Sequence, residues 1–155
     1  MKGGIIQKEI ALKYIFGGNS YTTFLNTNSN NRFTYKVTLS KKDKSIYYVC
    51  VLTGPDIYTY VGFYKNGEYF HSPKSTIGIE AQSIKVFNWV VFNLTKGTLP
   101  NFIEIWHDGR CGKCGKQLTV PKSIEVGIGP DCAKKIFTKE DMRDQKLNEL
   151  LKGLI

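Results

Sequence analysis

The sequence contains no apolar run that approaches the length of a membrane span. Its first six residues give way to Gln7-Lys8-Glu9 too early for a secretory signal peptide. The hydrophobic fraction of 41% and the charged fraction of 23% are typical of a soluble globular chain. We therefore expect no membrane partner and a location in a reducing cytoplasm, where clustered cysteines bind metals more often than they form disulfides.

The motifs of common catalytic sites are also missing. There is no Gly-x-Ser-x-Gly, Walker loop, His-Glu-x-x-His or paired-carboxylate motif. The His-x-Glu and Pro-Cys-x-x-Cys motifs of base deaminases are absent as well. We expect no enzymatic activity and identify no small-molecule substrate, with an uncharacterised zinc enzyme as the alternative.

Acidic residues are scarce relative to basic ones. The chain has 22 Lys and Arg against 13 Asp and Glu, a net charge of +9. Residues 1–100 hold 12 basic and 5 acidic side chains, whereas residues 101–155 hold 10 and 8. The positive excess lies in the N-terminal part and favours a polyanionic partner such as nucleic acid. The alternative is that the charge serves solubility alone.

Cysteines are few, but three of the four have the spacing of metal ligands. Cys111 and Cys114 are two residues apart, so both sulfurs can reach one ion across a tight turn. Gly115 lets the backbone fold back toward the sulfurs. Cys132 follows in a Gly-x-Gly-Pro-x-Cys segment, where Pro130 can begin a helix. Three thiolates and one imidazole complete a tetrahedral Zn²⁺ site, and we expect this zinc to be structural.

His107 is the candidate for the fourth ligand because it lies just before the Cys-x2-Cys pair. Asp108, Asp131 and water are alternatives, and a water ligand would give the zinc catalytic potential. The alternative to a metal site is a reduced turn with one buried cysteine. Cys50 lies within a predicted strand and is expected in the core. His71 has no partner in the sequence.

Alternating polar and apolar residues predict an antiparallel meander. The clearest strand covers residues 32–39, where one side is apolar and the other polar and basic. Gly54-Pro55-Asp56 and Asn66-Gly67 are strong turn signals. Strands are predicted over residues 20–26, 32–39, 46–53, 58–64, 68–71 and 102–106.

Helical spacing predicts helices over residues 6–16 and 80–96, the second ending at Gly97. Further helices are expected after Cys132 and after Thr138. The predicted fold class is α+β, an antiparallel meander with a covering helix, followed by a small zinc-stapled module and a C-terminal helix. The corresponding domains are a sheet-plus-helix domain, a zinc-binding module and a C-terminal helix, over residues 1–100, 101–137 and 138–155.

Aromatic residues crowd the predicted meander, and lysines lie at its edges and turns. Aromatic side chains beside lysines can stack unpaired bases, although aromatics also favour strands and pack cores. The aromatic residues are Tyr47, Tyr48, Tyr58, Tyr60, Phe63, Tyr64, Tyr69 and Phe70. The candidate phosphate-binding residues are Lys36, Lys41, Lys42 and Lys44.

Two segments of the sequence resemble proteins of phages, prophages and other mobile elements. The segment from Trp106 to Thr119, continued by Ser123-Ile124 and by Gly127 to Cys132, is similar to a small zinc-binding domain of unknown function found in them. Upstream, the likeness to the N-terminal region of such proteins rests on Phe33–Val37, Val51–Asp56 and Tyr58–Gly62. The resemblance spans most of the chain except the last helix, and it implies a phage origin, a zinc site and no particular reaction.

The leading functional prediction is a non-enzymatic, zinc-containing accessory protein of a phage or mobile element that binds nucleic acid through a basic, aromatic-rich N-terminal face. The alternative is a protein-binding module that inhibits or recruits a host factor in an anti-defence role, through the aromatic surface or the C-terminal helix. For a phage-encoded protein, the location is the host cytoplasm.

Overall fold

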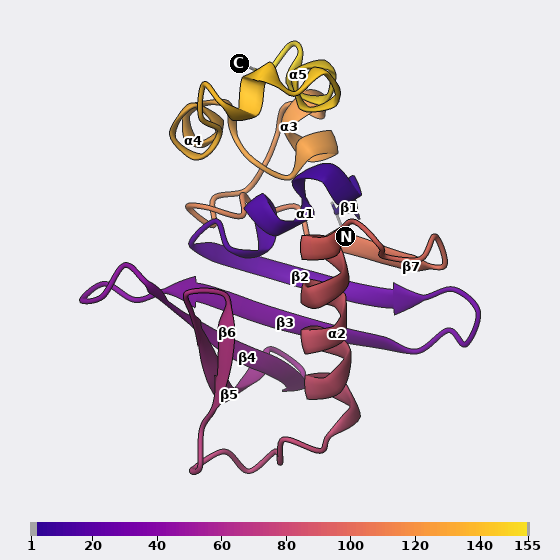
Figure 1. The fold of residues 1–155 in the computed structure, drawn as a ribbon, viewed down its shortest axis with the longest axis vertical. Helices are drawn as coiled ribbons and strands as arrows, with labels where there is room; N and C mark the ends of the chain where they lie inside the picture. Colours follow the sequence, from indigo (N-terminus) through magenta and orange to yellow (C-terminus); the bar gives the residue numbers. More distant parts are fainter. Residues whose placement is uncertain (1–2, 155) are drawn as a thin grey trace.

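The computed structural model describes residues 3–154, and its central feature is a seven-stranded antiparallel sheet (Figure 1). The strand order is β1-β7-β2-β3-β4-β5-β6. The predicted meander is confirmed as β2 to β6, and β7 lies on the other side of β2. The strands are β1 (Gly4–Ile5), β2 (Asn19–Asn26), β3 (Arg32–Leu39), β4 (Ile46–Gly54), β5 (Ile57–Lys65), β6 (Glu68–His71) and β7 (Ile103–His107).

One face of the sheet, the inner face, packs against α1 (Lys8–Ile15) and α2 (Gln82–Lys96). Figure 1 shows α2 crossing β2 and β3. The Phe87 ring of α2 lies 4.7 Å from the Tyr35 ring and 5.7 Å from the Phe24 ring, centre to centre. The Tyr35 hydroxyl donates to the Ser83 carbonyl at 2.7 Å, so its one polar atom is satisfied. This aromatic cluster is the centre of the core.

Helix α2 ends before Gly97, as the sequence predicts. Gly97 has a φ of 71°, in the left-handed region that glycine adopts without strain. Both predicted helices begin later than expected, at Lys8 and Gln82. None of the helices within residues 3–154 is long and apolar enough to cross a membrane.

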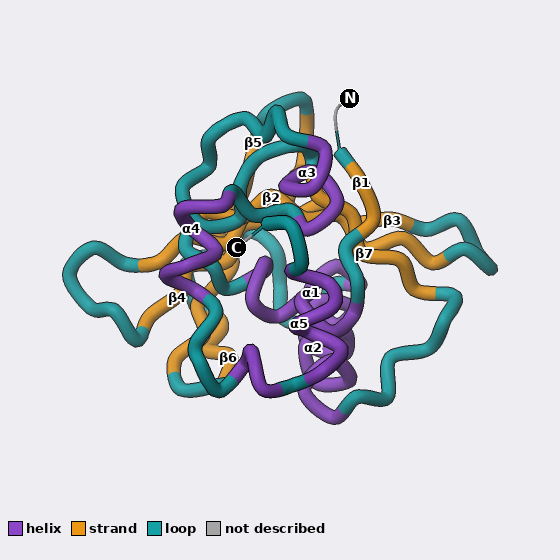
Figure 2. The backbone as a smooth tube through the Cα atoms, turned by 90° about the horizontal axis from the view of Figure 1, so that it is seen from above, coloured by secondary structure: helices purple, strands orange, loops and turns teal. Residues whose placement is uncertain are grey.

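The helices after β7 gather at one end of the sheet (Figure 1). Seen from above, α1 and α5 lie next to each other (Figure 2). The ion pair of Lys146 with Glu9, at 2.8 Å, joins these two helices, and a second ion pair joins Lys13 of α1 to Asp141, just before α5, at 3.0 Å. The C-terminal elements are α3 (Pro121–Val126), α4 (Pro130–Ile136), the 3-10 turn η1 (Asp141–Arg143) and α5 (Gln145–Leu151).

The last helix is shorter than the sequence predicts. Thr138 and Asp141 do form a reciprocal cap, since each side chain accepts a hydrogen bond from the other's backbone N–H, at 3.0 and 2.8 Å. That cap leads only into η1. Asp144 is extended and caps a new helix by accepting from the backbone N–H of Lys146 at 2.9 Å. A second capping residue therefore divides the predicted helix.

The segment after residue 100 returns to the sheet. Strand β7 pairs with β2 along its length, and β1 pairs with the outer edge of β7. The independence of segments 1–100, 101–137 and 138–155 stays a prediction.

Candidate metal centre and open sheet face

Three cysteines from two separate segments meet at one point. Cys111 and Cys114 lie in the loop after β7, and Cys132 lies in the first turn of α4. Their sulfur atoms all lie within 4.8 Å of one another. A tetrahedral Zn²⁺ with bonds of about 2.3 Å needs sulfurs about 3.8 Å apart, so the three cysteines could hold a metal ion.

The Cys-x2-Cys turn is held by its own backbone and by α1. The Gly115 N–H donates to the Cys111 carbonyl at 2.9 Å, and the Cys111 N–H donates to the Lys116 carbonyl at 2.8 Å. Gly115 turns the chain with a φ of 76°. A Cβ on Gly112 would lie 2.5 Å from the Tyr14 ring, so only glycine allows the turn to approach α1 this closely.

The thiols differ in how readily they ionise. Burial opposes ionisation of Cys111, but the backbone N–H groups of Cys114, Gly129 and Lys113 outweigh it and lower the pKa of this thiol. The Gly129 N–H lies 3.4 Å from the Cys111 sulfur. Burial, followed by the neighbouring sulfurs of Cys114 and Cys111, raises the pKa of Cys132 to about 12. Three thiolates therefore need a bound cation to coexist, and sulfur donors suit a soft or borderline metal.

His107, the predicted fourth ligand, does not join this cluster. Its Nε2 lies 2.6 Å from the Ile124 carbonyl, and its Nδ1 accepts from the Gly109 N–H at 3.0 Å. The carbonyl can only accept, so Nε2 carries the proton and Nδ1 uses its lone pair on Gly109. Burial lowers the pKa of His107, which keeps the ring neutral. The imidazole has no lone pair left for a metal.

The two acidic alternatives also lie outside the cluster. Asp108 pairs with Arg110, and Asp131 is exposed. Among residues 3–154, no histidine, aspartate or glutamate joins the three sulfurs. The cysteines border a cavity of about 440 Å³ whose lining includes Lys116, Asp131 and Lys135. The structure thus brings together three of the four predicted ligands.

The fold and the cysteine cluster define a mixed α+β protein with a candidate metal centre. Residues 107–137 match a family of unknown function, DUF6011. The match covers the cysteine cluster and leaves out the strands before His107. No curated protein and no solved structure gives a match to this chain.

The face of the sheet opposite α1 and α2, here called the open face, carries a continuous aromatic surface. Strand alternation puts Tyr47, Tyr64 and Tyr69 on the inner side and leaves five of the eight predicted aromatics outside. One cross-strand row runs over β2 to β5, and a second over β4 to β6. The rows are Tyr21, Lys36, Cys50 and Tyr60, and Tyr48, Phe63 and Phe70.

Aromatic rings contact one another both between the two rows and within the second row. Tyr48 and Tyr60 lie 5.9 Å apart, and Phe63 and Phe70 stack at 5.2 Å. Tyr48 is 38% exposed, Tyr60 39% and Phe70 41%. Cys50 is half-buried in the same surface, opposite Lys36, which corrects its predicted place in the core. Its neighbours on the open face are polar or exposed, Lys36 beside it on β3 and Tyr60 beside it on β5.

Two cations lie over Tyr21 at one end of this surface. The Lys36 ammonium is 5.4 Å from the centre of the Tyr21 ring, and the Arg110 guanidinium carbon is 3.5 Å from it. Sequence reasoning identified Lys36 but neither Tyr21 nor Arg110. Tyr21 alternates with the buried Ser20 and Thr22 along its strand, and this local pattern could place it on the open face. The approach of Arg110 from a distant segment leaves no such pattern in the sequence.

The other predicted phosphate ligands lie in the turn between β3 and β4. Lys41, Lys42 and Lys44 are exposed there. Among the described residues, none of the three takes part in an ion pair. Asp43, in the same turn, pairs with Lys65 at 3.6 Å. Of the four predicted lysines, Lys36 therefore lies on the open face, and the other three lie in the turn where β3 ends and β4 begins.

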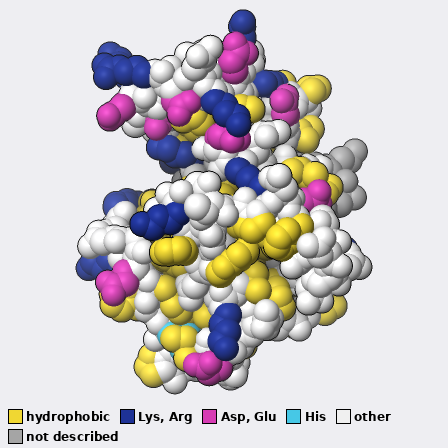
Figure 3. Space-filling model, turned by 45° about the vertical axis from the view of Figure 1, so that its right-hand side comes forward, with side chains coloured by type: hydrophobic (Ala, Val, Ile, Leu, Met, Phe, Trp, Pro, Cys, Tyr) yellow, Lys and Arg dark blue, Asp and Glu magenta, His cyan; other side chains and the backbone are white. Residues whose placement is uncertain are grey.

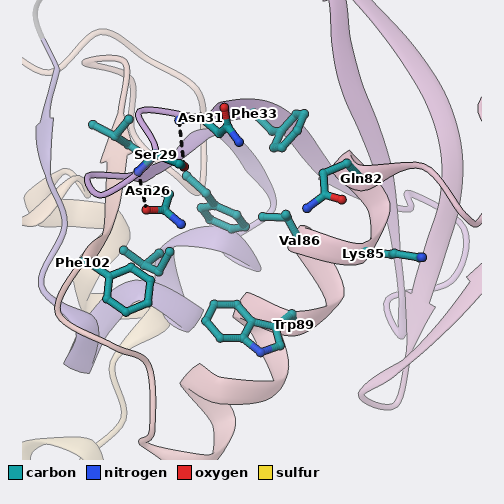
Figure 4. A pocket seen from close by; sticks show the side chains of 12 residues that line it. Asn26, Ser29, Asn31, Phe33, Gln82, Lys85, Val86, Trp89 and Phe102 are labelled. Carbon is teal, nitrogen blue, oxygen red and sulfur yellow. Dashed lines mark hydrogen bonds between the residues drawn. The ribbon is translucent and has the colours of Figure 1, made fainter.

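A second apolar surface lies on the other side of the molecule, where the β2–β3 turn meets α2. A cavity of about 440 Å³ opens there, and Figure 4 shows Trp89 and Phe102 facing each other across it. The side-chain oxygen Oδ1 of Asn26 accepts from the backbone N–H groups of Asn28 and Ser29, which fixes the Asn26 amide at the rim. Figure 3 shows hydrophobic side chains gathered on this side with few charges among them. We call it the Trp89 groove.

Proposed function

We propose that this protein is a non-enzymatic accessory protein of a phage or mobile element, which binds nucleic acid on the open face and uses zinc as a scaffold. The observation that carries the proposal is the pair of aromatic rows beside Lys36 and Arg110. Solvent-exposed aromatic rings contribute little to folding, whereas each can stack an unpaired base. The adjacent cations and the net charge of +9 suit a phosphate backbone.

Zinc is the metal that this proposal assigns to the cysteine cluster. Thiolates favour Zn²⁺ over the hard cations Mg²⁺ and Ca²⁺, and the Cys-x2-Cys spacing is common in structural zinc sites. The nearby helices α3 and α4 have six and seven residues, too short to be stable alone. A cross-link between Cys111, Cys114 and Cys132 would fix both to the end of the sheet.

The proposal is tested by titrating fluorescein-labelled oligothymidylate, oligouridylate and a DNA duplex at several salt concentrations, with fluorescence anisotropy as the readout. We expect salt-dependent binding that weakens by at least about tenfold in the double variant Tyr48→Ala/Tyr60→Ala, since each stacked base contributes about 1–3 kcal/mol. The matched control is Phe92→Ala, on the outer side of α2 and 59% exposed. Salt-insensitive binding, or none to any of the three probes, would contradict the proposal.

A protein partner is the second candidate function, and the Trp89 groove favours it. Trp89 is 43% exposed beside Phe102 and a cavity, a pattern that suits an anchoring side chain from a partner. The partner would be a host factor that the protein inhibits or recruits. A stoichiometric partner that survives nuclease treatment and is lost with Trp89→Ala, but retained by Tyr48→Ala/Tyr60→Ala, would favour this function over nucleic-acid binding.

A further inference from the structure

We propose that Arg110 is a nucleic-acid-binding residue of the open face and that the metal centre holds it in position. The proposal rests on the nucleic-acid function above and names its ligand class, single-stranded nucleic acid. In this proposal the metal-bound cysteines hold Arg110 in place on the binding surface and also stabilise the short helices. Arg110 acts on the ligand directly, and the three cysteines act through Arg110.

The side chain of Arg110 belongs to the binding surface although its backbone belongs to the metal-binding loop. The guanidinium carbon lies over the Tyr21 ring, 3.5 Å from the ring centre. Tyr21 in turn contacts Tyr58 at 5.6 Å between ring centres, edge to face. Lys36 approaches the Tyr21 ring at 5.4 Å. Two cations and two rings from four separate segments therefore meet at one corner of the open face.

Arg110 keeps part of its guanidinium available. Asp108 engages its Nε and Nη2 atoms, the former at 2.8 Å. No hydrogen bond within residues 3–154 engages Nη1, and the side chain is 38% exposed. A guanidinium held on one edge by a carboxylate and on its face by an aromatic ring is preorganised to donate from its remaining edge. A phosphate oxygen is the acceptor that suits it.

The cysteine turn determines where Arg110 sits. Arg110 and Gln117 pair through an isolated antiparallel β-bridge, and the Leu118 N–H donates to the Gly109 carbonyl at 2.8 Å. Residues 109–118 therefore fold back on themselves. Cys111 and Cys114 lie at the turn of this loop, directly after Arg110. A metal that ties both sulfurs to Cys132 on α4 fixes the loop at its tip. Loss of the metal would remove this restraint on the loop and weaken the contact of Arg110 with Tyr21.

A single strand suits this surface better than a duplex. Bases can stack on exposed rings such as Tyr48 and Tyr60 only when their faces are free, which base-paired helices prevent. The phosphates of a strand lying across the open face would then reach Lys36 and Arg110. A double-stranded probe should bind through charge alone, more weakly and without dependence on the tyrosines.

The test is a cycle of four affinities for fluorescein-labelled oligothymidylate. Wild type and Arg110→Ala are each measured with zinc bound and after zinc removal by a chelator, with circular dichroism to verify that the sheet persists. We expect Arg110→Ala to weaken binding about tenfold with zinc bound, and to lower the slope of log affinity against log salt by about one. Zinc removal should lower the affinity of wild type by a similar factor and leave the affinity of Arg110→Ala nearly unchanged.

Two matched variants sharpen the cycle. Lys139→Ala removes the same charge from an exposed position between α4 and η1 and should change affinity less than twofold. Asp108→Asn replaces the carboxylate that holds one edge of the guanidinium with a neutral amide and should weaken binding, because Arg110 then loses part of its preorganisation. If chelation unfolds the sheet as well, the positioning role of the metal is overturned, and Arg110→Ala with zinc bound still tests the role of Arg110.

The outcomes separate this inference from the function on which it rests. Equal affinity of Arg110→Ala and wild type, with Tyr48→Ala/Tyr60→Ala still weakened, overturns the role of Arg110 and keeps the nucleic-acid function. If zinc removal weakens the affinity by the same factor in wild type and in Arg110→Ala, the metal does not act through Arg110. That result overturns the positioning of Arg110 by the metal. Absence of binding by the zinc-loaded wild type overturns both proposals.

Discussion

The sheet and the segment after it are held together in different ways. The inner face of the sheet buries large aromatic side chains against α2, with Tyr35 fully buried and Phe87 nearly so. The segment from residue 108 onward has helices of six and seven residues and brings three cysteines to one point. We therefore expect the first region to be the more stable of the two, and the second, whose helices are short, to depend more on a cross-link or a neighbour.

The largest expected effect is the loss of the metal. Cys114→Ser should lose zinc and unfold residues around α3 and α4, since metal binding in small sites contributes about 10–16 kcal/mol to folding. The sheet should survive, because the rings at the centre of its core, Phe24, Tyr35 and Phe87, pack against one another rather than against the cysteines. Hydrogen exchange with mass spectrometry would show rapid exchange confined to this segment. Simultaneous exposure of β2 to β6 would show that the two regions are one cooperative unit.

The matched disruption of the sheet is Phe87→Ala. It removes a ring packed between Phe24, Tyr35 and Tyr64 and should lower the free energy of unfolding by about 3–5 kcal/mol. Phe92→Ala, on the exposed side of the same helix, should change it by less than about 0.5 kcal/mol. Urea denaturation measures both. Similar losses in the two variants would place the core elsewhere.

Replacing His107 distinguishes a structural histidine from a metal ligand. His107→Gln should keep the zinc, because the imidazole bonds to Ile124 and Gly109 rather than to the ion. It should still lower the free energy of unfolding by about 1–3 kcal/mol, since buried hydrogen-bond partners lose their geometry. Metal analysis and denaturation of the same sample measure both quantities. A zinc-free variant would instead restore His107 as the fourth ligand.

The smallest expected effect concerns the contact of α1 with η1 and α5 in acid. The hydrogen bond from Lys146 lowers the pKa of Glu9; for Asp141, hydrogen bonds from Thr138 and Lys13 outweigh burial and lower the pKa. Both carboxylates are ionised at a pH above their pKa values in the unfolded chain, which are about 4.3 for Glu9 and about 3.9 for Asp141. In that range they stabilise the docking of α5 and η1 on α1. That stability is lost as the pH falls through the lowered values.

Hydrogen exchange of the α5 amides in wild type and Lys146→Ala measures this contact. The variant should exchange faster near neutral pH, and the difference should vanish in acid once Glu9 is protonated. Because both proteins carry the same cysteine cluster, any loss of metal in acid affects them equally. A difference that persists after protonation would mean that Lys146 acts by packing rather than by charge.

The sequence predicts the meander and the cysteine cluster because both signals are local. Alternation along β3 and the Asn66-Gly67 turn fix neighbouring strands, and the Cys-x2-Cys spacing brings two sulfurs together regardless of the fold. The place of β7 beside β2 and the approach of Arg110 to Tyr21 depend on contacts between distant segments, which no local pattern encodes. Helix α3 was missed although Pro121 at its start and Gly127 after its end are ordinary signals.

His107 shows the limit of spacing as evidence. Its position just before Cys111 is that of a ligand, but it ends β7 on the inner face, where Thr22 lies opposite and the ring is buried. A buried histidine must satisfy both nitrogens, and the nearest partners are backbone groups of Gly109 and Ile124. Which partner a side chain meets is decided by packing, which the spacing of residues does not specify.

The most direct test of the account is the metal content and thiolate ligation of the purified protein. We predict one zinc per chain, none in Cys132→Ser, and a cobalt-substituted form whose sulfur-to-cobalt absorption has the intensity of three thiolates. Purified wild type that binds no zinc, or a Cys132→Ser variant that binds it as tightly as wild type, would contradict the metal centre.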